Sequence, residues 1–299
     1  MIKIGTRGSA LALWQANHIA GLIGKDRTEI VVIKTKGDRV RNVSFDKMEG
    51  KGFFTKEIED ALLSGAVDCA VHSLKDLPVD DTTGLALAAI TRREDPSDVL
   101  LVRDDRYDPG NTIPLVASAV VGTSSLRRAA QILHEMPTLT VKPLRGNVPT
   151  RVKRLRERKF DAIILARAGL KRLDIDISGF VEFTLPYSYF LPAPGQGALA
   201  IQVRAGDSGL RESLAFLNDK DSARAVKAER AFLNQFGAGC HVPLGALAYI
   251  EEGDIRLSGV VASTDGTQLV RDTVAGSDPD TLGASLARTL KDKGADSLL

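Results

Sequence analysis

The chain has 299 residues, of which 43% are apolar and 26% are charged, a composition typical of globular proteins. This length favours two or three domains, since a single core rarely grows so large. No apolar run approaches the ~20 residues of a membrane span, and the first residues lack the apolar core of a secretory signal. Two cysteines cannot form a disulfide framework in a chain of this size. We therefore expect a soluble, cytoplasmic protein.

The net charge of +2 conceals a strongly basic stretch between Val121 and Phe160. This stretch contains ten basic residues and two acidic ones, so it carries +8 and the remainder of the chain carries −6. Such a local field attracts anionic partners even when the whole molecule is nearly neutral. A solvated helix face explains residues 153–159 better, whereas the arginines nearer the start of the stretch lie in more specific contexts.

Short β-branched runs alternate with helical patterns, which is typical of βαβ units. The first series predicts strands at residues 2–6, 29–35, 67–71 and 85–90, and helices at 9–23 and 55–63. The second predicts strands at 117–122, 139–141, 160–165 and 198–203, and helices from about 124 and 148. A third region has helical patterns at 210–217 and 223–236, strands at 246–250, 255–263 and 269–274, and a closing helix after 279.

Two segments are candidate crossings between lobes: the charged turn at residues 92–96 and the Pro/Gly-rich segment at 191–197, which cannot be helical. A chain that leaves one lobe and later returns to it forms a two-lobed cleft, where ligands bind. The predicted fold is therefore α/β, with two mixed-sheet lobes and a third, smaller α+β domain. The predicted domains are residues 1–92 with 198–214, residues 97–190, and residues 218–299.

Residues 4–9 and 121–125 resemble each other, because each segment follows a strand and opens a helix with Thr and Ser. Such a helix N-terminus offers free backbone N–H groups to an anion. Ordinary N-capping explains either segment alone. The nearby arginines Arg7, Arg127 and Arg128 favour anion binding for the two segments together.

Four polar residues, His72, Ser73, Lys75 and Asp76, follow a predicted buried strand, in the position where open α/β sheets bind ligands. Asp76 lies among cationic groups, which favour its ionised form. An ionised carboxylate there can stabilise a developing positive charge or accept N–H donors. A solvated turn ended by Pro78 is an equally good explanation.

Two further segments supply cations. The glycine- and lysine-rich segment at residues 50–57 can cover a cleft, although it lacks the spacing of a phosphate P-loop. Arg145 and Arg151 lie on either side of a loop-to-helix junction, and arginine binds carboxylates through two parallel hydrogen bonds. Nucleic acid would suit the charge, but only 5% of residues are aromatic and no recognition motif is present.

Cys240 is flanked by glycines, which leave room for a molecule to approach its sulfur. His241 is a poor base for this thiol because adjacent side chains rarely point together, and this counts against acyl transfer by Cys240. The other cysteine, Cys69, fits a buried strand position. The four histidines have no metal-ligand spacing, so no metal is expected.

Together these segments resemble the hydroxymethylbilane synthase (porphobilinogen deaminase) family. The motifs GTRGSALALWQA, GKGFFTKE, HSLKDLP, VGTSSLRRA, LRGNVPTR, LPAPGQGA and GAGCHVPLGA occur in the family's order, from near the first residue to the final domain. The resemblance implies a fold of three domains, the first two built like periplasmic binding proteins. It also implies an enzyme that joins four porphobilinogen units into hydroxymethylbilane, with release of ammonia.

The resemblance implies a dipyrromethane cofactor attached through a thioether to Cys240, with Asp76 as the catalytic carboxylate. The implied cofactor-binding residues are Cys240, Lys75, Asp76, Thr123, Ser125, Arg127, Arg128 and Arg145. The implied substrate-binding residues are Arg7, Ser9, Lys51, Lys56, Ser73, Arg145, Arg151 and Gln196. His72 also lies near the implied site. We expect a monomer whose partner is porphobilinogen, and neither nucleic acid nor membrane. The alternative is a non-catalytic, two-lobed binding protein for a polycarboxylate, which fold alone does not exclude.

Overall fold

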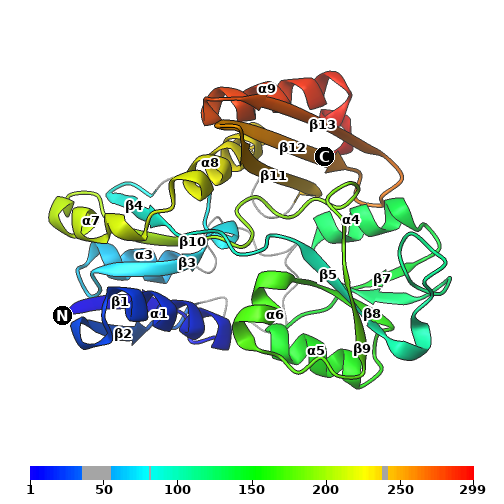
Figure 1. The fold of residues 1–299 in the computed structure, drawn as a ribbon, viewed down its shortest axis with the longest axis horizontal. Helices are drawn as coiled ribbons and strands as arrows, with labels where there is room; N and C mark the ends of the chain where they lie inside the picture. The colour runs from blue at the N-terminus through cyan, green and yellow to red at the C-terminus, as the bar shows by residue number, and fades with distance from the viewer. Residues whose placement is uncertain (36–54, 81, 238–241) are drawn as a thin grey trace. The chain divides into compact units, whose positions relative to one another are not determined.

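The computed structural model describes residues 1–35, 55–80, 82–237 and 242–299 (Figure 1). Lys51 and Cys240, both predicted site residues, lie outside these ranges. The described chain forms two compact units, which are considered separately below. Unit 1 comprises residues 1–94 and 197–224, and unit 2 comprises residues 95–196 and 225–299.

Unit 1 is built on a five-stranded sheet with the strand order β2-β1-β3-β10-β4. Its strands are β1 (Ile2–Thr6), β2 (Thr28–Val32), β3 (Cys69–Ser73), β4 (Leu85–Ile90) and β10 (Leu199–Arg204). The first three are parallel, whereas β10 runs antiparallel to both β3 and β4. Apolar residues of α1 (Ala10–Ile23) and α3 (Lys56–Leu63) pack in separate clusters with this sheet, and α7 (Ser208–Leu214) joins the α1 cluster.

Unit 2 contains a second five-stranded sheet, with the order β7-β6-β8-β5-β9. Its strands are β5 (Asp98–Arg103), β6 (Val120–Gly122), β7 (Thr140–Lys142), β8 (Ala162–Ala166) and β9 (Phe180–Thr184). Strands β7, β6 and β8 are parallel, and β5 runs antiparallel to β8 and β9. Its helices are α4 (Leu126–Glu135), α5 (Val148–Arg156) and α6 (Arg167–Leu173). Both sheets therefore place an antiparallel strand fourth, beside three parallel strands.

The rest of unit 2 is a three-stranded antiparallel sheet covered by helices. Its strands are β11 (Leu244–Glu251), β12 (Asp254–Ala262) and β13 (Leu269–Gly276), and its helices are α8 (Lys220–Asn234), which begins in unit 1, and α9 (Pro279–Asp292). A core that includes Phe232 and Leu286 joins sheet and helices. Leu191 packs with Leu247 and Val260, and Arg271 donates to the carbonyls of Tyr187 and Ser188. These contacts explain why this sheet belongs to the same compact unit as β5–β9.

The predicted α/β class, with two mixed sheets and a smaller α+β part, is confirmed. Most predicted strands and helices occur within a few residues of their expected positions, but β5, β9 and α6 were not predicted. The missed strand β5 has an apolar run of only four residues, 99–102, which lies between Asp98 and Arg103 and follows a charged turn. The chain passes between the units after Glu94 and after Gln196, within the two predicted crossing segments, and again within α8. The division into three domains stays a prediction.

The return of the chain into unit 1 requires a glycine at position 197. Gly197 has a φ of +92°, and a Cβ atom there would lie 2.3 Å from the carbonyl oxygen of Glu94. We predict that Gly197→Ala lowers the free energy of unfolding by about 2–4 kcal/mol, because it adds backbone strain to a steric clash. Gly206→Ala is the matched control, since a Cβ there meets nothing within 4 Å. Equal urea midpoints for the two variants would contradict this account.

Candidate cofactor and substrate site

Two of the predicted site arginines surround a buried carboxylate in unit 2. Asp98 is the first residue of β5, and Arg127 and Arg128 lie in the first turn of α4. Arg127 Nη1 donates to Asp98 Oδ2 at 2.7 Å, and Arg128 Nη2 donates to Asp98 Oδ1 at 2.6 Å. Arg128 Nε adds a third bond, at 3.1 Å. The Asp98 side chain is 0% exposed, so the three charges form one buried cluster.

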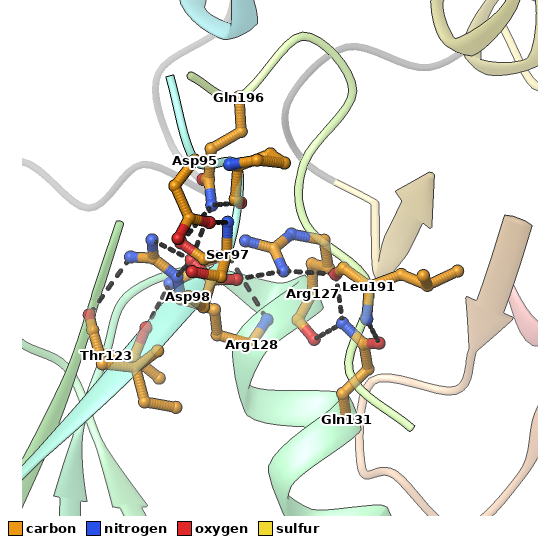
Figure 2. Close-up of polar contacts among 12 residues, drawn as sticks. Asp95, Ser97, Asp98, Thr123, Arg127, Arg128, Gln131, Leu191 and Gln196 are labelled. Carbon is orange, nitrogen blue, oxygen red and sulfur yellow. Dashed lines mark hydrogen bonds and ion pairs between the residues drawn. The ribbon is translucent and has the colours of Figure 1, made fainter. Parts of the chain in front are cut away.

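The same cluster is hydrogen-bonded to residues 191–196, the segment that follows the second sheet (Figure 2). Arg127 Nη1 also donates to the carbonyl of Leu191 at 2.6 Å, and the Gln131 amide exchanges two hydrogen bonds with the Leu191 backbone. Gln196 Nε2 donates to Asp98 Oδ1 at 2.9 Å. Asp98 therefore fixes α4 and residues 191–196 to the start of β5.

The charge state of this cluster follows from opposing effects. Burial by itself would raise the pKa of the Asp98 carboxyl, but the charges of Arg127 and Arg128 outweigh burial and hold that pKa well below its usual range. Burial lowers the pKa of Arg127, while Asp98 opposes that change. With two guanidinium groups and one carboxylate, the cluster carries a net charge of +1.

Hydroxyl groups cap the helices at both predicted anion-binding segments. Ser9 Oγ accepts from Ala12 N at 3.3 Å at the start of α1, and Ser125 Oγ accepts from Arg128 N at 3.4 Å at the start of α4. Thr123 Oγ1 accepts from Ser125 N at 3.1 Å. N-capping is therefore confirmed for both serines, and anion binding at these helix ends stays a prediction.

The second pair of predicted arginines lies at the start of α5. Asn147 caps this helix by accepting from Thr150 N at 3.0 Å, and Arg151 Nε donates to the carbonyl of Gly146 at 2.7 Å. Arg145 and Arg151 are both half-buried. Within the described part of the chain, neither arginine shares a hydrogen bond with Asp98.

In unit 1, the predicted residues gather at the end of β3. Ser73 ends the strand, and its Oγ accepts from Gln15 Nε2 of α1 at 2.7 Å. A short 3-10 turn (Leu74–Asp76) follows, in which Lys75 is half-buried and Asp76 is exposed. Arg7 is half-buried just after β1, and Lys56 is exposed at the start of α3.

Thus the structure joins Arg127, Arg128 and Gln196 in one network in unit 2, and it places Ser73, Lys75 and Asp76 in one segment of unit 1. Asp98, which organises the network, was not among the predicted site residues. One signal was available, because an aspartate directly precedes the apolar run 99–102 and a buried carboxylate needs cationic partners.

Among the described residues, no group of His, Cys, Asp and Glu could hold a metal ion.

Comparisons with known proteins cover both units. A family model described as the porphobilinogen deaminase, dipyrromethane cofactor binding domain matches residues 2–212, and the model of the porphobilinogen deaminase C-terminal domain matches residues 223–292. The chain belongs to the porphobilinogen deaminase family. Curated porphobilinogen deaminases from Geobacillus kaustophilus and Lawsonia intracellularis are 45% and 46% identical to it, over 100% of this chain and 96% and 97% of their own lengths.

A solved structure of the Bordetella pertussis BvgS periplasmic VFT2 domain has a TM-score of 0.42 and 14% sequence identity, over 72% of this chain and 85% of that one. Membership of the porphobilinogen deaminase family confirms the predicted family and the dipyrromethane cofactor, and it favours the predicted transferase over the binding protein. No helix within the described ranges has the length and apolar character needed to cross a membrane.

The Asp98 cluster predicts a large effect of a small substitution. Asp98→Asn leaves two guanidinium groups buried without a counter-charge, so we expect the free energy of unfolding to fall by about 3–5 kcal/mol, measured by urea denaturation. Asp176→Asn is the control, since this exposed carboxylate pairs with Arg156 at the surface, and its loss should change little. A variant Asp98→Asn as stable as Asp176→Asn would contradict a structural role for the cluster.

The same cluster also predicts a dependence on pH. The pKa of Asp98 is lower in the folded than in the unfolded protein, so its stabilisation is fully present above about pH 4 and is lost progressively as the pH falls further. The difference in stability between wild type and Asp98→Asn should therefore narrow below about pH 4. A difference that stays constant from pH 7 to pH 3 would show that the carboxylate is not ion-paired.

Proposed function

We propose that this protein joins four porphobilinogen units head to tail, releasing one ammonia for each unit, and that one water releases the product as hydroxymethylbilane. The observation that carries this proposal is the match to both porphobilinogen deaminase domains, which together extend from residue 2 to residue 292. The dipyrromethane cofactor supplies the primer on which the product chain grows. We further propose that the enzyme acts in the cytoplasm as a monomer.

We propose Cys240 as the attachment point, and the other cysteine supports this choice. Cys69 is completely buried in β3, and burial, aided by the neighbouring charge of Asp68, raises the pKa of its thiol to about 12. Because the thiolate is the reactive form, Cys69 stays inert at neutral pH. Cys240 lies outside the described residues, and glycines flank it in the sequence.

The residues of unit 2 fit a cofactor rich in carboxylates. Each pyrrole ring carries an acetate and a propionate, so the bound molecule gains negative charge as it grows. The Asp98 cluster has a net charge of +1, and Arg127 uses only Nη1 in its hydrogen bonds to other described residues. An arginine has five N–H donors, so Nε and Nη2 of Arg127 can serve a carboxylate.

The proposed binding residues are those that the resemblance to the family implies. The cofactor would contact Lys75, Asp76, Thr123, Ser125, Arg127, Arg128 and Arg145. The substrate and the growing chain would contact Arg7, Ser9, Lys51, Lys56, Ser73, Arg145, Arg151 and Gln196. For Gln196 this role competes with its hydrogen bonds to Asp98 and to the carbonyl of Pro96, which make it a structural residue as well.

Asp76 is the proposed catalytic residue. Loss of ammonia from porphobilinogen leaves a cationic, electrophilic methylene group, and formation of each C–C bond leaves a second cation that must release a proton. A carboxylate near the pyrrole N–H groups stabilises both cations and can help to move the proton. Asp76 is exposed beside Lys75, and so accessible to substrate.

The attachment predicts a measurable mass. The purified wild-type protein should exceed its sequence mass by one dipyrromethane unit, and peptide mapping should place this adduct on Cys240. Cys240→Ser should lack the adduct, whereas Cys69→Ala should retain it because the buried thiol plays no part in attachment. A fully active wild-type protein without any adduct would refute the proposed tether.

The catalytic role of Asp76 predicts a loss of turnover without a loss of fold. Asp76→Asn keeps the size of the side chain but removes its charge, so we expect kcat for porphobilinogen consumption to fall about 10²–10³-fold while loading of the first substrate persists. Asp80→Asn, also exposed and four residues along the chain, should retain nearly normal kcat. Similar kcat values for the two variants would exclude Asp76 as the catalytic carboxylate.

A further inference from the structure

The end of β3, which leads into the turn carrying Lys75 and Asp76, is held on both faces of its sheet. Successive residues of a strand point to opposite faces. On one face, Ser73 bonds to Gln15 of α1. On the other, His72 Nε2 lies 3.1 Å from Gln202 Oε1 of β10, and Gln202 Nε2 donates to Glu59 Oε1 of α3 at 3.0 Å. A chain of three polar side chains thus connects β3 to α3 through β10.

The chemistry of these groups fixes the direction of each hydrogen bond. An ionised carboxylate only accepts hydrogen bonds, so Glu59 orients the Gln202 amide with its NH₂ group toward Glu59. The amide oxygen of Gln202 then faces His72 and needs a donor. His72 must therefore carry its proton on Nε2, and Nδ1 is left as the acceptor nitrogen.

Burial keeps this histidine neutral. His72, Gln202 and Glu59 are 6%, 5% and 9% exposed. Burial lowers the pKa of His72 to about 4, although the hydrogen bond with Gln202 opposes this change. At neutral pH the imidazole is therefore uncharged, and its hydrogen-bond partners decide which of the two tautomers it adopts.

We infer that Glu59, acting through Gln202, fixes His72 in the neutral Nε2–H tautomer, and that His72 is a positioning residue for the turn that carries Lys75 and Asp76. The part of this inference that concerns catalysis rests on the proposed function. His72 lies only two residues before the turn. The first residue of the turn, Leu74, donates its backbone N–H to the carbonyl of Ala198 at 3.0 Å. We therefore expect a change in the bonding of His72 to shift the end of β3 and, with it, the start of the turn.

The first experiment measures the tautomer directly in the full-length holoenzyme. Nitrogen-15 NMR of labelled protein at neutral pH distinguishes the two ring nitrogens, and single His→Gln substitutions assign the four histidines. We expect His72 to be protonated on Nε2 in the wild type. Glu59→Gln should reduce the population of this tautomer, because the new amide can donate to Gln202 and reverse its orientation.

Asp60→Asn is the matched control, since it removes one carboxylate from an exposed position of the same helix. It should leave the His72 signals unchanged. A wild-type His72 that is protonated on Nδ1, or one whose signals are the same in Glu59→Gln as in the wild type, would overturn the inference. This measurement does not depend on enzymatic activity.

The second experiment tests the catalytic consequence with porphobilinogen as substrate. His72→Leu removes the Nε2–H donor, and we expect kcat to fall about tenfold to a hundredfold with little change in KM, because small displacements of reacting groups have effects of this size. His72→Gln can restore a donor to Gln202 and should recover most of the lost kcat. Equal losses in the two variants, or wild-type kcat in His72→Leu, would refute the positioning role.

Glu59→Gln keeps this second test decisive if His72→Leu does not fold. A lowered kcat in Glu59→Gln beside near-normal kcat in His72→Gln supports the positioning role, and wild-type kcat in both refutes it. Failure of the proposed function is recognised separately, because the wild-type protein itself would then not consume porphobilinogen, while the NMR result would still decide the tautomer.

Discussion

The arrangement of unit 2 depends on the buried ion cluster of Asp98 with Arg127 and Arg128. Removing three charges from water is unfavourable unless each is paired, so the cluster is stable only as a whole. Its members come from the start of β5 and the first turn of α4, and its hydrogen bonds extend to Leu191 and Gln196. Asp98 therefore fixes the first turn of α4 and Gln196 to the start of β5.

The ion pairs with Asp98 also restrict the side chains of Arg127 and Arg128, and this bears on the ligand-binding role proposed for them. A free arginine must lose side-chain freedom when it binds a carboxylate, and that loss weakens binding. Asp98 holds both guanidinium groups in place and neutralises only one of the two charges. In the proposed role of Arg127, its Nε and Nη2 groups would bind a carboxylate while Nη1 stays bonded to Asp98 and Leu191.

Much of the fold could be predicted from the sequence, because α1, β3 and β10 show clear local patterns. Strand β5 was missed because its apolar run, residues 99–102, is short and lies between the charged residues Asp98 and Arg103. The partnership of Asp98 with arginines about 30 residues away has no local signature, so the sequence indicated Arg127 and Arg128 only as ligand-binding residues. The similarity of residues 4–9 to 121–125 was a correct structural signal, because each segment joins the first parallel strand of its sheet to a helix capped by Ser9 or Ser125.

The two units differ in whether the polar side chains of their proposed sites are buried or exposed. In unit 2, Arg127 and Arg128 are buried and held by Asp98, an arrangement that fits their proposed contact with a permanently bound polyanion. In unit 1 Asp76 is exposed, and the buried contacts of Ser73 and His72 hold the strand before it rather than the carboxylate itself. In its proposed catalytic role, Asp76 must meet each new pyrrole ring, and an accessible side chain on a fixed backbone meets that requirement.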